Sequence, residues 1–107
     1  MQWRQGDVLI ERIDDNIELS QKSEETLLVR GEGRYHGHFA TGDVTVYTEN
    51  GNLYLEVHSQ AQVEHLHTET RSFTGEHHPI SLPRGKYRII RQREYNPYEK
   101  TIAFVQD

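Results

Sequence analysis

The chain has 107 residues and no cysteine, a length that allows one core and a composition that excludes a disulfide framework, a zinc finger and a thiol nucleophile. A net charge of −5 argues against a general nucleic-acid binder, although it leaves room for a local basic patch. Only 34% of the residues are hydrophobic, which favours a core built from amphipathic strands with one wet face. We expect a single domain over residues 1–107.

A membrane location is not expected from the sequence. No stretch approaches the roughly 20 apolar residues that cross a bilayer. Residues 1–7 lack the apolar region of a signal peptide. We therefore expect a cytoplasmic protein without a membrane partner.

The first half of the chain is predicted to form short strands separated by turns. The expected strands cover residues 8–13, 26–30, 44–48 and 53–57. The acidic stretch 14–25 is expected to be a surface loop or a frayed helical turn. Asn50-Gly51 supplies the positive φ that a tight hairpin turn between the last two strands needs.

The second half continues in the same way. A strand over 61–67, a polar loop over 68–76, an extended segment over 79–83, a long strand over 86–95 and a last strand over 101–105 are expected. Asn96-Pro97 predicts one short helical turn near 96–100. The sequence thus predicts an all-β fold: a small antiparallel barrel or roll of about eight short strands.

Histidine dominates the candidate chemistry. Six of the seven histidines form three pairs, His36/His38, His65/His67 and His77/His78. Two residues at i and i+2 of a strand share a face, so each H-x-H pair can converge on one centre. Imidazole is the commonest metal ligand and titrates near neutrality, which suggests a metal, proton-transfer or anion-binding site.

A metal site is the first hypothesis. Two H-x-H pairs from different strands, with a third histidine group, could complete a site for zinc, iron, manganese or nickel. We predict the ligands His36, His38, His65 and His77. Glu76, next to His77, is the preferred carboxylate partner. The competing interpretation is a wet strand face that holds no metal. The sequence does not show whether His67 and His78 belong to the predicted site, and His58 is expected at the surface.

A basic stretch follows the histidines. It contains Arg84, Lys86, Arg88, Arg91 and Arg93. Guanidinium groups beside imidazoles suit a phosphate or carboxylate ligand, and we expect Arg88 or Arg91 to serve in this way. Alternating charge on a solvated strand, paired with acidic neighbours, explains the same pattern without a ligand.

The chain resembles a group of small, uncharacterised bacterial proteins. The resemblance is carried by Gln5-Gly6-Asp7-Val8-Leu9-Ile10, His36-Gly37-His38, His77-x-Pro79-Ile80, Pro83-x-Gly85-x-Tyr87-Arg88 and Arg91-Gln92-Arg93-Glu94-Tyr95. It implies that the histidines of that group fall on His36, His38 and His77, with His65 as a fourth. Tyr35 stands where that group has glycine, and residues 66–75 look like an insertion. The resemblance implies no activity.

The chain is also similar, more weakly, to cupins. His36-x-His38 followed by Pro83-x-Gly85 has the cupin order, and cupins hold a metal in a small β-barrel. The glutamate that follows H-x-H in cupins is missing, and Arg88 occupies the place of their last histidine. This likeness implies the barrel class and not the ligand set.

Two functions of different classes follow from these observations. The first is a divalent transition-metal protein in which metal-activated water hydrolyses an anionic, phosphate-containing ligand, with Glu76, Arg88 and Arg91 as catalytic candidates. The second is a non-catalytic binding module or complex subunit whose histidine and arginine face contacts a protein, a nucleotide or RNA. A homo-oligomer is a further expectation, because so small a β domain can complete its core by pairing. The sequence does not decide whether the protein is an enzyme.

Overall fold

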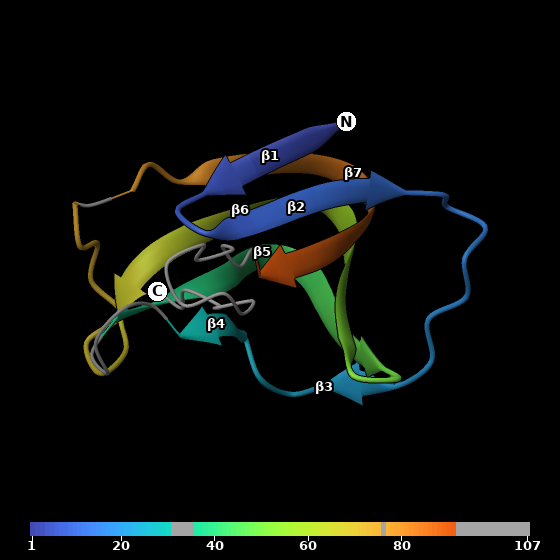
Figure 1. Cartoon of the computed structure of the whole chain (residues 1–107), viewed down its shortest axis with the longest axis horizontal. Coiled ribbons are helices and arrows are strands. Elements are labelled where there is room, and N and C mark those ends of the chain that lie inside the picture. The colour runs from blue at the N-terminus through green and yellow to red at the C-terminus, as the bar shows by residue number, and fades with distance from the viewer. Residues whose placement is uncertain (31–35, 76, 92–107) are drawn as a thin grey trace, which may run out of the picture.

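A computed structural model describes residues 1–30, 36–75 and 77–91, and in these ranges every regular element is a β-strand (Figure 1). The strands are β1 (Gln2–Gln5), β2 (Val8–Ile13), β3 (Lys22–Ser23), β4 (Leu27–Arg30), β5 (His36–Glu49), β6 (Asn52–His67) and β7 (Ile80–Arg91). The described ranges hold no helix, and so none that could span a membrane. The predicted all-β class is confirmed.

The seven strands form one antiparallel sheet in the order β1-β2-β7-β6-β5-β3, and β4 also pairs with β5. Within the described ranges the two ends of this order do not pair, so the sheet is curled but not closed into a barrel. Figure 1 shows the β1–β2 hairpin at the top of the view and β3 and β4 at the bottom. The helical turn expected at 96–100 and the strand expected at 101–105 lie outside the described residues.

β5, β6 and β7 are longer than predicted. β5 starts at His36, before the strand expected at 44–48, and the strands expected at 53–57 and 61–67 are the two halves of β6. The extended segment expected at 79–83 and residues 86–91 of the expected long strand merge in β7, whereas residues 92–95 lie outside the described residues. A β-bulge explains how such long strands curl. Between the pairs Val44–Val57 and Gly42–Ala61, β5 advances by two residues while β6 advances by four. The extra residues bend the sheet and reset the register beyond the bulge.

The core occupies the interior face of this curled sheet. Its buried residues are Val8, Ile10, Ala40, Val46, Leu55, Val57, Ala61, Val63, Leu82, Tyr87 and Ile89. Tyr87 is fully buried, its ring lies edge-on to Trp3 with centroids 5.5 Å apart, and its hydroxyl donates to the Pro83 carbonyl. Ala40 and Val63 are the last apolar residues of this face before the histidines of β5 and β6 begin.

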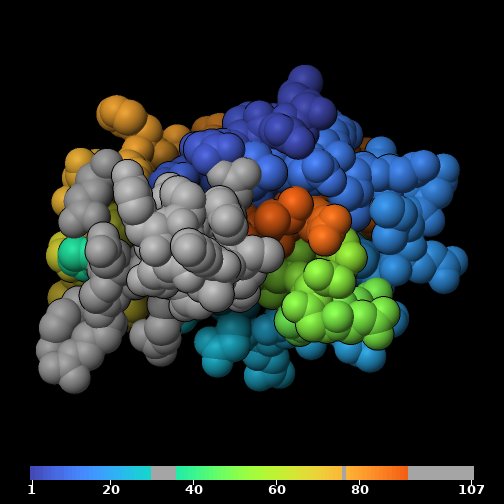
Figure 2. All heavy atoms as spheres, in the orientation of Figure 1, coloured from blue at the N-terminus to red at the C-terminus, as the bar shows by residue number. Residues whose placement is uncertain are grey.

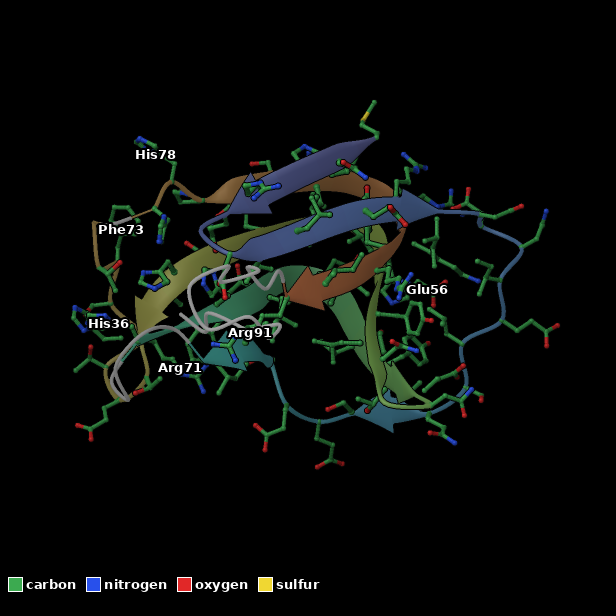
Figure 3. All side chains as sticks on the ribbon, viewed as in Figure 1. His36, Glu56, Arg71, Phe73, His78 and Arg91 are labelled. Carbon is green, nitrogen blue, oxygen red and sulfur yellow. The ribbon has the colours of Figure 1, made fainter. Side chains whose placement is uncertain are left out.

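The two ends of the sheet differ in chemistry. The tip of the β5–β6 hairpin and the 14–21 loop form one end, on the right in Figure 2. His36 lies at the other end, on the left in Figure 3. The histidine-rich end is where β5 begins and β6 ends.

A cluster of five histidines at one end of the sheet

The register of β5 on β6 places histidine opposite histidine. His36 pairs with His67 and His38 pairs with His65. Because alternate residues of a strand share a face, all four imidazoles lie on one face of the sheet, as the H-x-H spacing predicted for each pair, and this is the interior face. Gly37 between the two β5 histidines lets β4 approach closely, since an added Cβ would lie 2.4 Å from Leu27 Cδ1.

His77 joins the four from the segment before β7. We call His38, His65 and His77 the inner triad and His36 with His67 the outer pair. In the inner triad, ring centroids are 4.8 Å apart for His38–His65, 4.8 Å for His65–His77 and 6.0 Å for His38–His77. The ring centroids of the outer pair are 4.8 Å apart, and the His36 centroid lies 5.6 Å from that of His65. The sheet therefore brings the four predicted ligands together and adds His67.

Burial increases from the outer pair inward. The His38 side chain has no exposed surface and His65 is 3% exposed, whereas His36, His67 and His77 are half-buried. Fully buried histidine is uncommon, and a buried imidazole needs hydrogen-bond partners. The partners of the two buried rings therefore decide what each ring can do.

Gln5 fixes the tautomer of His38. The Gln5 side-chain amide donates to the carbonyls of Val63, at 2.9 Å, and His78, at 2.8 Å, which leaves its oxygen as an acceptor. That oxygen lies 2.7 Å from His38 Nδ1, so Nδ1 carries the proton. The lone pair of the neutral ring is then on Nε2, which is buried and has no hydrogen-bond partner among the described residues.

Thr74 orients His65 in the same way. The Thr74 hydroxyl donates to the His65 carbonyl at 3.3 Å and lies 2.6 Å from His65 Nδ1. When the hydroxyl donates to the carbonyl, it accepts from Nδ1, and the lone pair of a neutral ring is then on Nε2. This arrangement is compatible with the same tautomer in both buried imidazoles.

The environment also keeps His38 neutral. The pKa of His38 is lowered from 6.5 to about 4, chiefly by burial and then by the neighbouring His65, while the Asp7 carboxylate acts in the opposite direction and His77 and Arg91 make smaller contributions that lower it. At neutral pH the ring therefore carries no charge and keeps a lone pair on Nε2.

Asp7 and Arg91 form an ion pair beside the inner triad. Arg91 Nε donates to Asp7 Oδ2 at 3.1 Å, and both side chains are largely buried. Arg91 pairs with Val8 across the sheet and so shares the interior face (labelled in Figure 3). Arg88 is exposed on the opposite face of β7, and Glu76 lies outside the described residues.

The remaining histidines lie apart from the cluster. His78 is exposed and its side chain points away from the sheet in Figure 3, although its carbonyl accepts a hydrogen bond from Gln5. His58 is exposed, as expected, with Nε2 2.8 Å from the Thr45 hydroxyl. In the described ranges, no group of three or more His, Asp or Glu side chains is placed so as to hold a metal ion directly.

Sequence reasoning missed three residues of this site: Gln5, Asp7 and Thr74. A weak signal existed for the first two, because polar residues flank Gly6, whose φ of 62° marks the tight turn between β1 and β2. Nothing in the sequence distinguishes Thr74 from the other polar residues of its loop.

Comparison with family models gives one match. The model described as "Domain of unknown function (DUF8820)" matches residues 4–92. The chain belongs to this family. The matched range includes all five clustered histidines and Gln5, so the site lies within the family domain.

The family match confirms the expected likeness to an uncharacterised group of proteins. It does not extend to the individual motifs or to the cupin likeness, and its description assigns no activity. The searches of curated proteins and of solved structures gave no match.

Proposed function

We propose that the protein binds a divalent transition-metal ion through the inner triad, with Nε2 of His38 and His65 and the imidazole of His77 as ligands. The observation that carries this proposal is the buried Nε2 of His38, which has no hydrogen-bond partner in the described ranges. A buried acceptor left without a donor costs about 1–3 kcal/mol. An ion bound at this nitrogen would remove that cost.

The hydrogen bonds on the other ring nitrogens support the same function. Metal-binding histidines almost always donate their second N–H to a carbonyl, carboxylate or water, which fixes the ring and its tautomer. Gln5 accepts this bond from His38, and the Thr74 hydroxyl is placed to accept it from His65. Both buried rings can therefore present Nε2 to an ion.

The ring separations are near those of a shared ion. With nitrogen about 2 Å from zinc, the centroids of two imidazole ligands lie roughly 4.5–5.5 Å apart. Two of the three separations are 4.8 Å, and His38–His77 is longer at 6.0 Å. We expect His77 to turn inward when an ion binds. Its side chain is half-buried, and its imidazole makes no hydrogen bond to a described residue.

The charge of the cluster favours a cation over an anion. An anion would be held by protonated imidazoles, but burial keeps the pKa of His38 at about 4 and so keeps the ring neutral. Imidazole ligands suit zinc, nickel and iron better than magnesium or calcium, and manganese stays a weaker candidate. A bound transition metal would lower the pKa of a coordinated water to about 7. Hydrolysis of an anionic, phosphate-containing ligand, with Arg91 beside the ion, stays a prediction.

Metal analysis of protein purified without an affinity tag tests the proposal. We expect about one equivalent of zinc, nickel, iron or manganese per chain, and a rise in melting temperature when the same ion is added to chelated protein. The double variant His38→Ala/His65→Ala should lose both the bound metal and the rise in melting temperature. The matched control is His58→Ala/His78→Ala, which removes two exposed histidines and should keep both.

The proposal fails if wild-type protein carries less than about a tenth of an equivalent of every ion and shows no thermal shift with any of them. It also fails if the double variant His38→Ala/His65→Ala, folded by circular dichroism, binds as tightly as the control.

A further inference from the structure

We propose that the outer pair, His36 and His67, is a second and weaker metal position on the solvent side of the cluster, through which the ion reaches the inner triad. This inference rests on the proposed function of the inner triad and adds to it the route by which the ion is loaded.

The pairing of β5 with β6 is the first support. His36 and His67 occupy directly opposite positions in an antiparallel pair, where Cβ atoms lie about 4.5–5.5 Å apart. Their ring centroids are 4.8 Å apart, so two nitrogens can approach one ion with no change in the backbone. Both side chains are half-buried and therefore reachable from solvent.

A surface pocket beside His67 supplies oxygen donors. It has a volume of about 400 Å³ and is lined by His67, Glu69, Thr70 and Ser72. Two backbone hydrogen bonds close the loop on His67, because its N–H donates to the Ser72 carbonyl at 2.9 Å and its carbonyl accepts from Arg71 at 2.9 Å. The pocket is therefore held next to the imidazole. A carboxylate and water complete a site for a divalent ion that has two imidazole ligands.

The rings also form a continuous path inward. The ring centroids of His67 and His36 are 4.8 Å apart, and those of His36 and His65 are 5.6 Å apart. The His65 centroid lies 4.8 Å from that of each other member of the inner triad. An ion that leaves the outer pair meets His65 next. Each transfer then exchanges one imidazole for another, and the ion is never without a nitrogen ligand.

The affinities of the two positions should differ. The inner rings are buried and oriented by Gln5 and Thr74, so little freedom is lost when they bind an ion. The outer rings are half-buried and the nearby Glu69 is exposed, so more side-chain freedom is lost there. A weak outer position that exchanges rapidly is what loading requires.

Cobalt titration of untagged, full-length protein, with Co²⁺ alone as the probe, tests this inference. Wild-type protein should bind one Co²⁺ tightly and a second weakly, seen as two phases in the visible absorption of the ion. His67→Gln should remove the second phase, keep the affinity of the first, and slow the stopped-flow uptake of the first ion at least about tenfold. His58→Gln, an exposed residue of the same strand whose Nε2 lies 2.8 Å from the Thr45 hydroxyl, should change neither quantity.

The outcomes separate the two proposals. If His67→Gln takes up Co²⁺ at the wild-type rate with wild-type stoichiometry, the outer position is overturned and the inner site stands. If His38→Ala/His65→Ala keeps the weak phase alone, the outer position is supported independently of the inner one. Wild-type protein that binds no Co²⁺ overturns both.

Discussion

The interior face of β5 and β6 has a buried region on each side of the bulge, and the two regions differ in chemistry. On the hairpin side of the bulge the face is apolar, with Val46, Leu55 and Val57 in the core. On the other side it carries His38 and His65, which are as deeply buried. Apolar burial stabilises the fold by about 25 cal/mol per Å², whereas burial of an imidazole with an unpartnered nitrogen is unfavourable. One half of the face therefore stabilises the fold, and we propose that the other half binds a metal ion.

Leu55→Ala should have the largest effect and sharpens this contrast. Leu55 is fully buried in the core, so truncation should lower the free energy of unfolding by about 2–5 kcal/mol. His36→Ala, at the half-buried histidine end, should lower it by less than about 1 kcal/mol in metal-free protein. Urea unfolding with chelator measures both. Equal losses would contradict the division between the two halves.

Acid should destabilise the metal-free protein through His38. Its pKa is about 4 when folded and 6.5 in the unfolded chain, so the unfolded state binds the proton first as the pH falls. The contribution of neutral His38 to the free energy of unfolding is fully present above pH 6.5, declines as the pH falls below 6.5, and stops changing below about pH 4. The loss is about 3 kcal/mol, from 1.36 kcal/mol per pKa unit.

Urea unfolding of chelated protein at pH 7.5 and 4.5 checks this loss, with His38→Leu as the comparison. The variant should lose about 2.5 kcal/mol less between the two pH values, because its other titrating groups are those of the wild type and pH 4.5 lies just above the folded pKa of His38. Identical losses in the two proteins would show that His38 is not buried neutral.

Gln5→Leu should weaken metal binding without removing a ligand. The change deletes the acceptor of His38 Nδ1–H, and loss of such a partner costs about 10–100-fold in metal affinity. Gln62→Leu is the matched control, because Gln62 is exposed on the opposite face of β6. Isothermal titration with zinc measures the affinities. Equal affinities in the two variants would mean that Gln5 does not position His38.

Gly37→Ala should have the smallest effect. The added methyl would lie 2.4 Å from Leu27 Cδ1 and 3.3 Å from the Val29 carbonyl oxygen. The leucine end can move more easily than the backbone, so we expect a loss of about 1 kcal/mol in unfolding free energy. Thermal unfolding measures it. A stability equal to that of the wild type would show that β4 does not pack closely on Gly37.

The all-β class, the Asn50-Gly51 turn and the shared face of each H-x-H pair could be predicted, because they depend on local patterns of one strand. The register that pairs the β5 histidines with the β6 histidines could not be predicted. Counted back from the turn without a bulge, His36 would face His65 and His38 would face Val63. The bulge beyond Val57 shifts the pairing by two residues, so that each histidine meets a histidine.

The partners of the buried rings were also beyond the sequence. Gln5 lies 33 residues from His38 and reaches it only because β2 joins β7 at the far side of the curled sheet. Arg88 and Arg91 looked equivalent in the basic stretch. Alternation along β7 turns Arg91 toward the interior and Arg88 toward solvent.

The most direct test of the central claim is the histidine side-chain ¹⁵N spectrum of the protein at pH 7, first metal-free and then with zinc. We predict that metal-free His38 is neutral, with the proton on Nδ1, and that zinc shifts the Nε2 resonances of His38 and His65 while His38 Nδ1 stays protonated. A protonated Nε2 on His38 before zinc is added, or Nε2 resonances that zinc leaves unchanged, would contradict the account.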